Sequence, residues 1–83
     1  MEIDYSNRRY VIFNVSELGT VDFSQVMETS ASTVRRSLDG TQTFVKYDGD
    51  QPSSVAALTT KSQEYTHSEI LTILQGPDWT PAE

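Results

Sequence analysis

The sequence has no cysteine, a single histidine, only six Lys and Arg residues and no long hydrophobic run. Without cysteine the chain has no disulfide, no thiolate metal site and no cysteine nucleophile. This lack agrees with a reducing compartment. No apolar segment is long enough for a signal-peptide core or a membrane-spanning helix, so we expect a protein of the cytoplasm.

The 83 residues predict one small domain, residues 1–83, with residues 1–7 and 80–83 as loose tails. A chain of this size buries only about 60% of the surface of its unfolded form. It therefore depends on a small core, or it gains burial by self-association. We expect a homo-oligomer.

Acidic residues outnumber basic ones by twelve to six, which gives a net charge of −6. Binding to nucleic acid depends on cations that release counterions from phosphates, so this balance disfavours it, although a local basic patch would still bind. The main expected effect of the charge is solubility. An acidic surface also favours basic protein partners.

Residues 10–15 (YVIFNV) are the clearest strand, with five large β-favouring side chains in six. Alternation places Tyr10, Ile12 and Asn14 on one face and the intervening residues on the other. Both faces are largely apolar, whereas a strand with one wet face alternates apolar with polar residues. We therefore expect this strand to be covered on both sides, either inside its sheet or by another subunit.

Two further β-favouring runs, residues 33–38 and 41–47, flank the dipeptide Asp39-Gly40. Asp-Gly between such runs predicts a β-hairpin with a type I′ turn, in which both central residues have positive φ. A two-residue loop sets Leu38 opposite Thr41. A three-residue loop with a bulge at Gly40 is the alternative, and it brings Phe44 beside Val34.

We favour the two-residue register because it collects more apolar area on one face. That face holds Val34, Leu38, Val45 and Tyr47, and the opposite face holds Arg35, Phe44 and Lys46.

Residues 21–29 are ambiguous: Val21 and Phe23 alternate as in a strand, whereas Phe23, Val26 and Met27 have the i, i+3, i+4 spacing of a helix. We expect a short helix or helical turn. Residues 16–19 and 48–52 are predicted turns, and residues 30–32 and 59–64 are predicted loops. Residues 53–58 fit either a helical turn or a short strand.

The C-terminal helix has the strongest local signals. Thr66 and Glu69 form a capping box, and Tyr65 and Ile70 are placed for a hydrophobic staple. The sequence predicts a helix of about ten residues, ended at Gly76 and Pro77. Its apolar stripe must pack on the sheet, and we expect Trp79 to fold back onto the same core.

No pattern predicts catalysis. Metal sites and nucleophile–base pairs need several convergent groups, and the only histidine, His67, is expected to be solvated in the first turn of the helix. Asp48 and Asp50 lack the further ligands of a calcium loop. Neither a glycine-rich phosphate loop nor a nucleophile elbow occurs. We therefore expect no enzyme activity, no metal and no cofactor.

The paired arginines are the best binding candidates. In strands, one arginine of each pair can join a common face, and cations beside an exposed aromatic are typical of sheets that bind single-stranded nucleic acid. The alternative is that these cations pair with nearby carboxylates or cover sheet edges. The candidate surface for nucleic acid or another partner comprises Arg8, Arg9, Arg35, Phe44 and Lys46.

Four segments of the sequence resemble a family of small uncharacterised proteins of marine cyanophages: YVIFNVSEL, SLDGTQTFVKYDG, PSSVAALTTK and YTHSEILTIL. The resemblance covers Arg9 to about Trp79. It implies a virus-encoded accessory protein in the cytoplasm of a cyanobacterial host. More distantly, it implies an Sm-like fold, a strongly bent antiparallel sheet that forms rings and binds nucleic acid.

The sequence departs from the usual Sm signatures. It lacks the Asp-x-x-hydrophobic-Asn loop and the Arg-Gly that follow the middle and late strands, and its clear helix follows the strands instead of preceding them. No site residues are therefore transferred from that family.

Together these observations predict an α+β fold: an antiparallel sheet of three to five strands, with residues 10–15 inside it and the C-terminal helix across one face. Two functions fit. One is a non-enzymatic accessory protein that binds a host or viral protein. The other is a homo-oligomeric ring that binds single-stranded nucleic acid.

Overall fold

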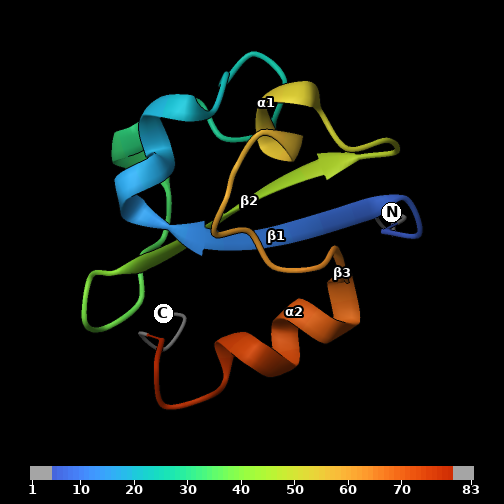
Figure 1. The fold of residues 1–83 in the computed structure, drawn as a ribbon. Helices are drawn as coiled ribbons and strands as arrows, with labels where there is room; N and C mark the ends of the chain where they lie inside the picture. The colour runs from blue at the N-terminus through green and yellow to red at the C-terminus, as the bar shows by residue number, and fades with distance from the viewer. Residues whose placement is uncertain (1–4, 80–83) are drawn as a thin grey trace.

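The protein is a small α+β fold in which a sheet lies between a layer of short helical segments and a C-terminal helix (Figure 1). The computed structural model describes residues 5–79. Of the predicted tails, 1–7 and 80–83, residues 1–4 and 80–83 lie outside the described residues, and residues 6–7 form a turn. In chain order the elements are β1 (Arg8–Asn14), η1 (Val15–Thr20), η2 (Ala31–Thr33), β2 (Gln42–Asp48), α1 (Ser53–Ala56), β3 (Tyr65–Thr66) and α2 (His67–Leu74), where η denotes a 3-10 helix.

The sheet of the described residues is antiparallel, with the strand order β2-β1-β3. β1 is therefore the central strand, as the sequence predicts. Its seven residues pair with β2 from Arg8 opposite Asp48 to Asn14 opposite Gln42. The pairing with β3 is short and places Arg9 opposite Thr66.

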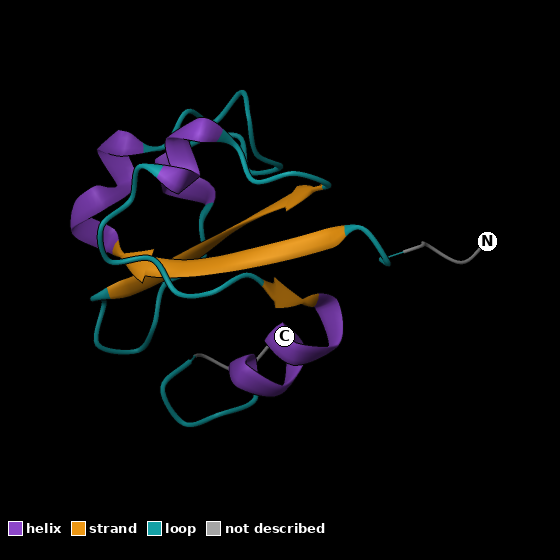
Figure 2. Ribbon diagram, turned by 45° about the vertical axis from the view of Figure 1, so that its right-hand side comes forward, coloured by secondary structure: helices purple, strands orange, loops and turns teal. Residues whose placement is uncertain are grey.

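Both faces of β1 are covered by this same chain. Figure 2 shows α1 and the 3-10 helices on one side of the sheet and α2 on the other. Val11 and Phe13 belong to one buried cluster, and Tyr10 belongs to a second, with Ile12 packed against it. The predicted alternation is confirmed, and no second subunit is needed to cover the strand.

The first cluster is the larger and lies under the short helical segments. Its buried members are Val11, Phe13, Leu18, Val21, Val34, Val45, Tyr47, Val55 and Leu58. The second cluster lies between the sheet and α2 and comprises Tyr10, Phe44, Ile70 and Trp79. Full burial of one such side chain contributes about 1.5–3 kcal/mol, so neither cluster is a minor addition.

The C-terminal helix has the predicted start. The Thr66 side chain accepts a hydrogen bond from the Glu69 N–H (3.3 Å), and the Glu69 carboxylate accepts one from the Thr66 N–H (2.9 Å). The helix has eight residues, close to the predicted ten. Trp79 folds back as expected and packs edge-to-face on Phe44, with ring centroids 5.7 Å apart.

The hairpin around Asp39-Gly40 is only partly as predicted. Its register is correct, since Arg36 lies opposite Thr43, but the two make an isolated bridge. Residues 33–38 do not form a strand; the start of this run lies in η2. The partner of β2 is β1, because seven paired residues bury more apolar surface than the short run offers.

The turn type and one side-chain position were also predicted wrongly. Gly40 has a φ of +76°, but Asp39 does not have positive φ, so the turn is not type I′. The Gly40 N–H instead bonds to the Ser37 carbonyl at 3.0 Å. Leu38, expected on the buried face with Val34, is 60% exposed because it lies in the loop itself.

The sequence predicted a short helix or a helical turn at 21–29. No helix forms there; the segment consists of turns and bends, with one turn closed by the bond from the Gln25 N–H to the Asp22 carbonyl (2.9 Å). Asp22 accepts hydrogen bonds from the backbone N–H and the hydroxyl of Ser24, a local arrangement that competes with a helix. The side-chain amide of Gln25 bonds to Ser53 and Ser54, the first two residues of α1. Of residues 30–32, predicted as loop, Ser30 precedes η2 as its N-cap and residues 31–32 lie in η2.

Residues 53–58 contain the helical turn α1, one of the two structures expected there. Residues 59–64 form the expected loop, but the loop pairs with β1 through hydroxyl groups. Ser62 donates its N–H to the Ile12 carbonyl (2.7 Å) and accepts the Ile12 N–H on its side chain (3.0 Å). The Asn14 N–H bonds to the hydroxyl of Thr60 at 2.9 Å.

Glu17 fixes this loop to η1. Its carboxylate accepts hydrogen bonds from the backbone N–H and the hydroxyl of both Thr59 and Thr60. These bonds, first that of the Thr60 hydroxyl, lower the pKa of Glu17 from 4.5 to about 2. The ionised form is therefore favoured by folding.

We expect the Glu17 interaction to make stability fall in acid. Because the pKa is lower in the folded state, the stabilisation is fully present above the unfolded pKa of 4.5 and disappears as the pH falls toward 2. Thermal unfolding between about pH 5 and pH 2 should show a shallower pH dependence for Glu17→Gln than for the wild type. Asp50→Asn, a change at an exposed carboxylate, is the control and should keep the wild-type slope.

The positive φ of Gly40 predicts a second effect on stability. An added Cβ meets no atom within 4 Å at Gly40 or at Gly19, and only Gly40 of these two has positive φ. Gly40→Ala should therefore lower the free energy of unfolding by about 1 kcal/mol relative to Gly19→Ala. Denaturant unfolding of both variants measures the difference, and equal values would contradict the backbone argument.

Candidate functional site

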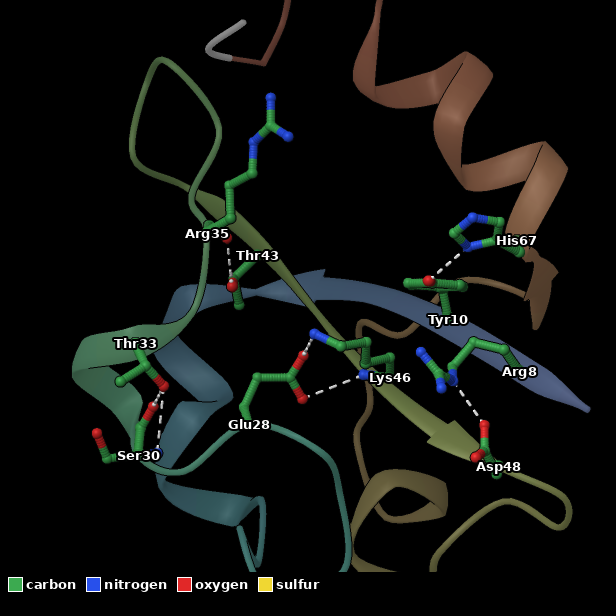
Figure 3. Close-up of polar contacts among 10 residues, drawn as sticks. All are labelled: Arg8, Tyr10, Glu28, Ser30, Thr33, Arg35, Thr43, Lys46, Asp48 and His67. Atoms are coloured by element: carbon green, nitrogen blue, oxygen red, sulfur yellow. Dashed lines mark hydrogen bonds and ion pairs between the residues drawn. The ribbon is translucent and has the colours of Figure 1, made fainter. Parts of the chain in front are cut away.

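The five residues of the predicted basic surface do not form one open platform. Arg8 lies at the end of β1 opposite Asp48, whereas Arg35 lies beside Thr43, near the other end of β2 (Figure 3). Phe44 was expected to be an exposed aromatic side chain but is buried at 8% exposure. It packs between Tyr10 and Trp79 because α2 covers that face of the sheet.

Three of the cations bond within the chain. Arg8 forms an ion pair with Asp48 at 2.6 Å, which raises the pKa of its guanidinium. Arg9 donates from Nη1 to the carbonyls of Ser6 (2.9 Å) and Arg8 (2.8 Å). These contacts fix the start of β1, which agrees with the alternative that the cations serve pairing and edge cover.

Lys46 is the third of these cations, and its contacts cover the outer edge of β2. Its ammonium group lies 3.2 Å from Glu28 Oε1, and its backbone N–H donates to Glu28 Oε2, also at 3.2 Å (Figure 3). The Glu28 side chain is only 6% exposed. The Met27 N–H bonds to the Lys46 carbonyl, so this short segment takes the place of a neighbouring strand.

His67 is not the solvated side chain that the sequence predicted. Its ring stacks on Tyr5 with centroids 3.7 Å apart and an interplanar angle of 4°, and its Nδ1 lies 2.8 Å from the Tyr10 hydroxyl. Burial raises the pKa of Tyr10. Which of the two groups donates the hydrogen bond depends on the tautomer of the imidazole. No local sequence signal links residues this far apart in the chain.

A shallow hollow of about 370 Å³ lies beside this stack. It is lined by Tyr5, Ser6, Arg9, Thr66, His67 and Ser68.

Among residues 5–79 there is no group of three or more His, Cys, Asp or Glu side chains that would hold a metal ion. Within the same residues, no helix is both long and apolar enough to cross a membrane.

Leu38, the most exposed large hydrophobic side chain within residues 5–79, lies at a second hollow, at the tip of the hairpin. We define the hairpin-tip surface as residues 37–39, 41–42 and 77–78, which line a hollow of about 390 Å³. The Leu38 N–H bonds to the Asp78 carbonyl at 2.8 Å, so the hairpin and the segment after α2 lie together. This bond explains how Leu38 is held at the surface.

The hairpin-tip surface carries a fixed negative charge. Asp39 Oδ1 accepts hydrogen bonds from the hydroxyl and N–H of Thr41 and from the Ser37 hydroxyl. These bonds, first that of the Thr41 hydroxyl, lower the pKa of Asp39 to about 2. Asp78 adds a second exposed carboxylate across the hollow. The sequence pattern did not indicate this surface, because it predicted Leu38 on the apolar face of the hairpin with Val34.

Comparison with known proteins found no protein-family model, curated protein or solved structure that is significantly similar to this chain.

The burial of Glu28 predicts that Lys46 serves stability. Lys46→Met keeps much of the side-chain stem but leaves the buried carboxylate without its cation, which should cost about 1–3 kcal/mol of unfolding free energy. Lys61→Met makes the same change at an exposed position and should cost less than about 0.5 kcal/mol. Denaturant unfolding provides both values, and a Lys46→Met variant that loses no more stability than Lys61→Met would contradict a stabilising role of the ion pair.

Proposed function

We propose that this chain is a non-enzymatic protein that acts by binding a partner protein through the hairpin-tip surface. The partner segment is expected to carry a basic side chain next to an apolar one. The observation that carries this proposal is the position of Leu38, which is 60% exposed at the rim of a hollow that also presents two carboxylates.

The exposure of Leu38 is a fixed feature of the fold. Its backbone is bonded to Asp78, and the adjacent turn is closed by the bond from the Gly40 N–H to the Ser37 carbonyl. Because the backbone is already held in place, less conformational freedom is lost when Leu38 enters an interface, which favours a specific contact. Leu38 therefore supplies the apolar part of the proposed interface.

Charge complementarity supports a basic partner. The whole chain has a net charge of −6, and Arg8 and Lys46 are engaged in ion pairs of the fold. Asp39 is ionised throughout the physiological pH range because its pKa is about 2. Like-signed carboxylates at one hollow attract a Lys or Arg side chain and speed its encounter with the surface.

The likeness to small cyanophage proteins supports a viral accessory role in the cytoplasm of the host cell. A viral protein of this size that lacks a catalytic motif acts most simply by occupying a surface of another protein. Self-association is a separate part of the proposal. It gains no support from incomplete burial, because both faces of β1 are covered within the chain.

The alternative, an Sm-like ring that binds single-stranded nucleic acid, has less support. Stacking of bases requires an exposed aromatic side chain between cations. Phe44 is buried, and the nearby Lys46 is paired with Glu28.

The proposal can be tested with two short peptides that differ only in charge. One carries a leucine flanked by lysines, and the other carries the same leucine flanked by glutamates. Titration followed by amide chemical shifts should show the lysine peptide at residues 37–42 and 77–78, with weaker binding at high salt. Leu38→Ser and Asp78→Asn should each weaken binding by about fivefold or more.

Leu71→Ser is the matched control, since Leu71 is 46% exposed on α2 and lies outside the hairpin-tip surface. It should leave peptide affinity unchanged. Equal binding of the two peptides, shifts that map elsewhere, or equal losses in Leu38→Ser and Leu71→Ser would refute the proposal.

A further inference from the structure

A further hollow lies beside the hairpin-tip surface, next to the end of β1. It has a volume of about 330 Å³ and is lined by residues 14–16, Gly40 and Thr41; we call it the Asn14 hollow. The hairpin-tip hollow is bounded by residues 77–78 instead, and Thr41 lines both hollows. The turn of the hairpin therefore separates two neighbouring hollows.

This turn is held in place on both sides. The Val15 N–H donates to the Thr41 carbonyl at 2.9 Å, and the Leu38 N–H donates to the Asp78 carbonyl at 2.8 Å. The turn is thus fixed both to the end of β1 and to the segment after α2. A ligand meets both hollows in a preformed arrangement, which lowers the entropic cost of occupying them together.

The two hollows differ in their chemistry. The hairpin-tip surface has two carboxylates beside the exposed Leu38. The Asn14 hollow has no charged lining residue, and its polar lining residues are Asn14, Ser16 and Thr41, which carry one amide and two hydroxyls. Uncharged groups of this kind match the peptide groups of a bound chain, whereas the carboxylates select a basic side chain.

The fold leaves the side chain of Asn14 unused. Asn14 is exposed and is the N-cap residue of η1, a position where an asparagine side chain commonly accepts an N–H of the first turn, but it makes no such bond. Its backbone N–H is bonded to the Thr60 hydroxyl at 2.9 Å. The backbone is therefore held, while the amide stays available both to donate and to accept a hydrogen bond.

We infer that the partner segment is an extended chain that lies across both hollows, an inference that rests on the proposed function. A basic and an apolar side chain of the segment contact the hairpin-tip surface, and the backbone beside them bonds to the Asn14 amide. An extended backbone has free N–H and C=O groups to offer, whereas a helix pairs its own. About six extended residues span roughly 20 Å, enough to cover two hollows that share a lining residue.

The test uses the whole chain and three peptides with blocked ends and equal charge. The short peptide is a leucine flanked by lysines, and the long peptide adds two threonines at each end. In the third peptide the added threonines are N-methylated, which removes their backbone donors. The long peptide should bind the wild type about fivefold or more tighter than the short one, because it adds backbone hydrogen bonds. The N-methylated peptide should bind like the short one.

Amide chemical shifts locate each peptide. The short peptide should shift residues 37–42 and 77–78, and the long peptide should shift residues 14–16 as well. Asn14→Ala should bind the short peptide as the wild type does, but its affinity for the long peptide should fall by about threefold or more. Asn7→Ala is the matched control, since it removes the same side chain at an exposed position just before β1 and should leave both affinities unchanged.

Binding of the short peptide at the hairpin-tip surface without any gain from the added threonines would overturn the inference and leave the proposed function standing. A gain that survives both N-methylation and Asn14→Ala would overturn it in the same way. Tighter binding of a helical, alanine-based peptide of equal length and charge would assign the surface to a helix. Shifts at residues 14–16 that grow with protein concentration alone would assign the Asn14 hollow to a second copy of the chain. If no peptide shifts residues 37–42, the proposed function fails and the inference fails with it.

Discussion

The alternation of side chains along β1 places Tyr10 in one buried cluster and Val11 and Phe13 in the other. β1 contributes side chains to both clusters. The position of every other element therefore depends on which face of β1 it covers. The short helical segments close one face, and α2 with Trp79 closes the other. In a chain of 83 residues, a core divided in this way depends on every buried side chain for its stability, because no further layer of structure covers either cluster.

The many Ser and Thr residues of the sequence have a physical role in the edges of the sheet. Where β3 is too short to accompany β1, the hydroxyls of Thr60 and Ser62 accept the N–H groups that a longer strand would have bonded. Glu17 then fixes the same loop to η1 through four hydrogen bonds. On the opposite edge, Glu28 and Lys46 close the side of β2. Backbone donors at both edges are thus satisfied by side chains.

The distribution of charge follows from this use of side chains. Arg8 and Lys46 are needed to anchor the sheet, so they are withdrawn from the surface that the sequence suggested for binding. The carboxylates at the hairpin-tip surface stay exposed, and hydrogen bonds keep Asp39 ionised. Arg35 is the exception, a cation whose buried Nη2 atom has no hydrogen-bond partner within residues 5–79. The sequence identified Arg35 as a candidate, but it gave no sign of Leu38 and Asp78 as neighbours, since a backbone bond across 40 residues joins them.

The sequence by itself determined the features whose causes lie within a few residues. The composition of residues 10–15 specified a strand with two apolar faces, and the Thr66–Glu69 capping box specified the start of α2. Asp39-Gly40 specified a turn, though not its type, because positive φ is required only at Gly40. The tertiary structure decided the rest: β2 pairs with β1 instead of with residues 33–38, His67 stacks on Tyr5, and Phe44 is buried under Trp79. These outcomes depend on competition between segments far apart in the chain, where the pairing that buries the most surface and satisfies the most backbone groups prevails. A short stretch of sequence does not show which of these alternative pairings is the more stable.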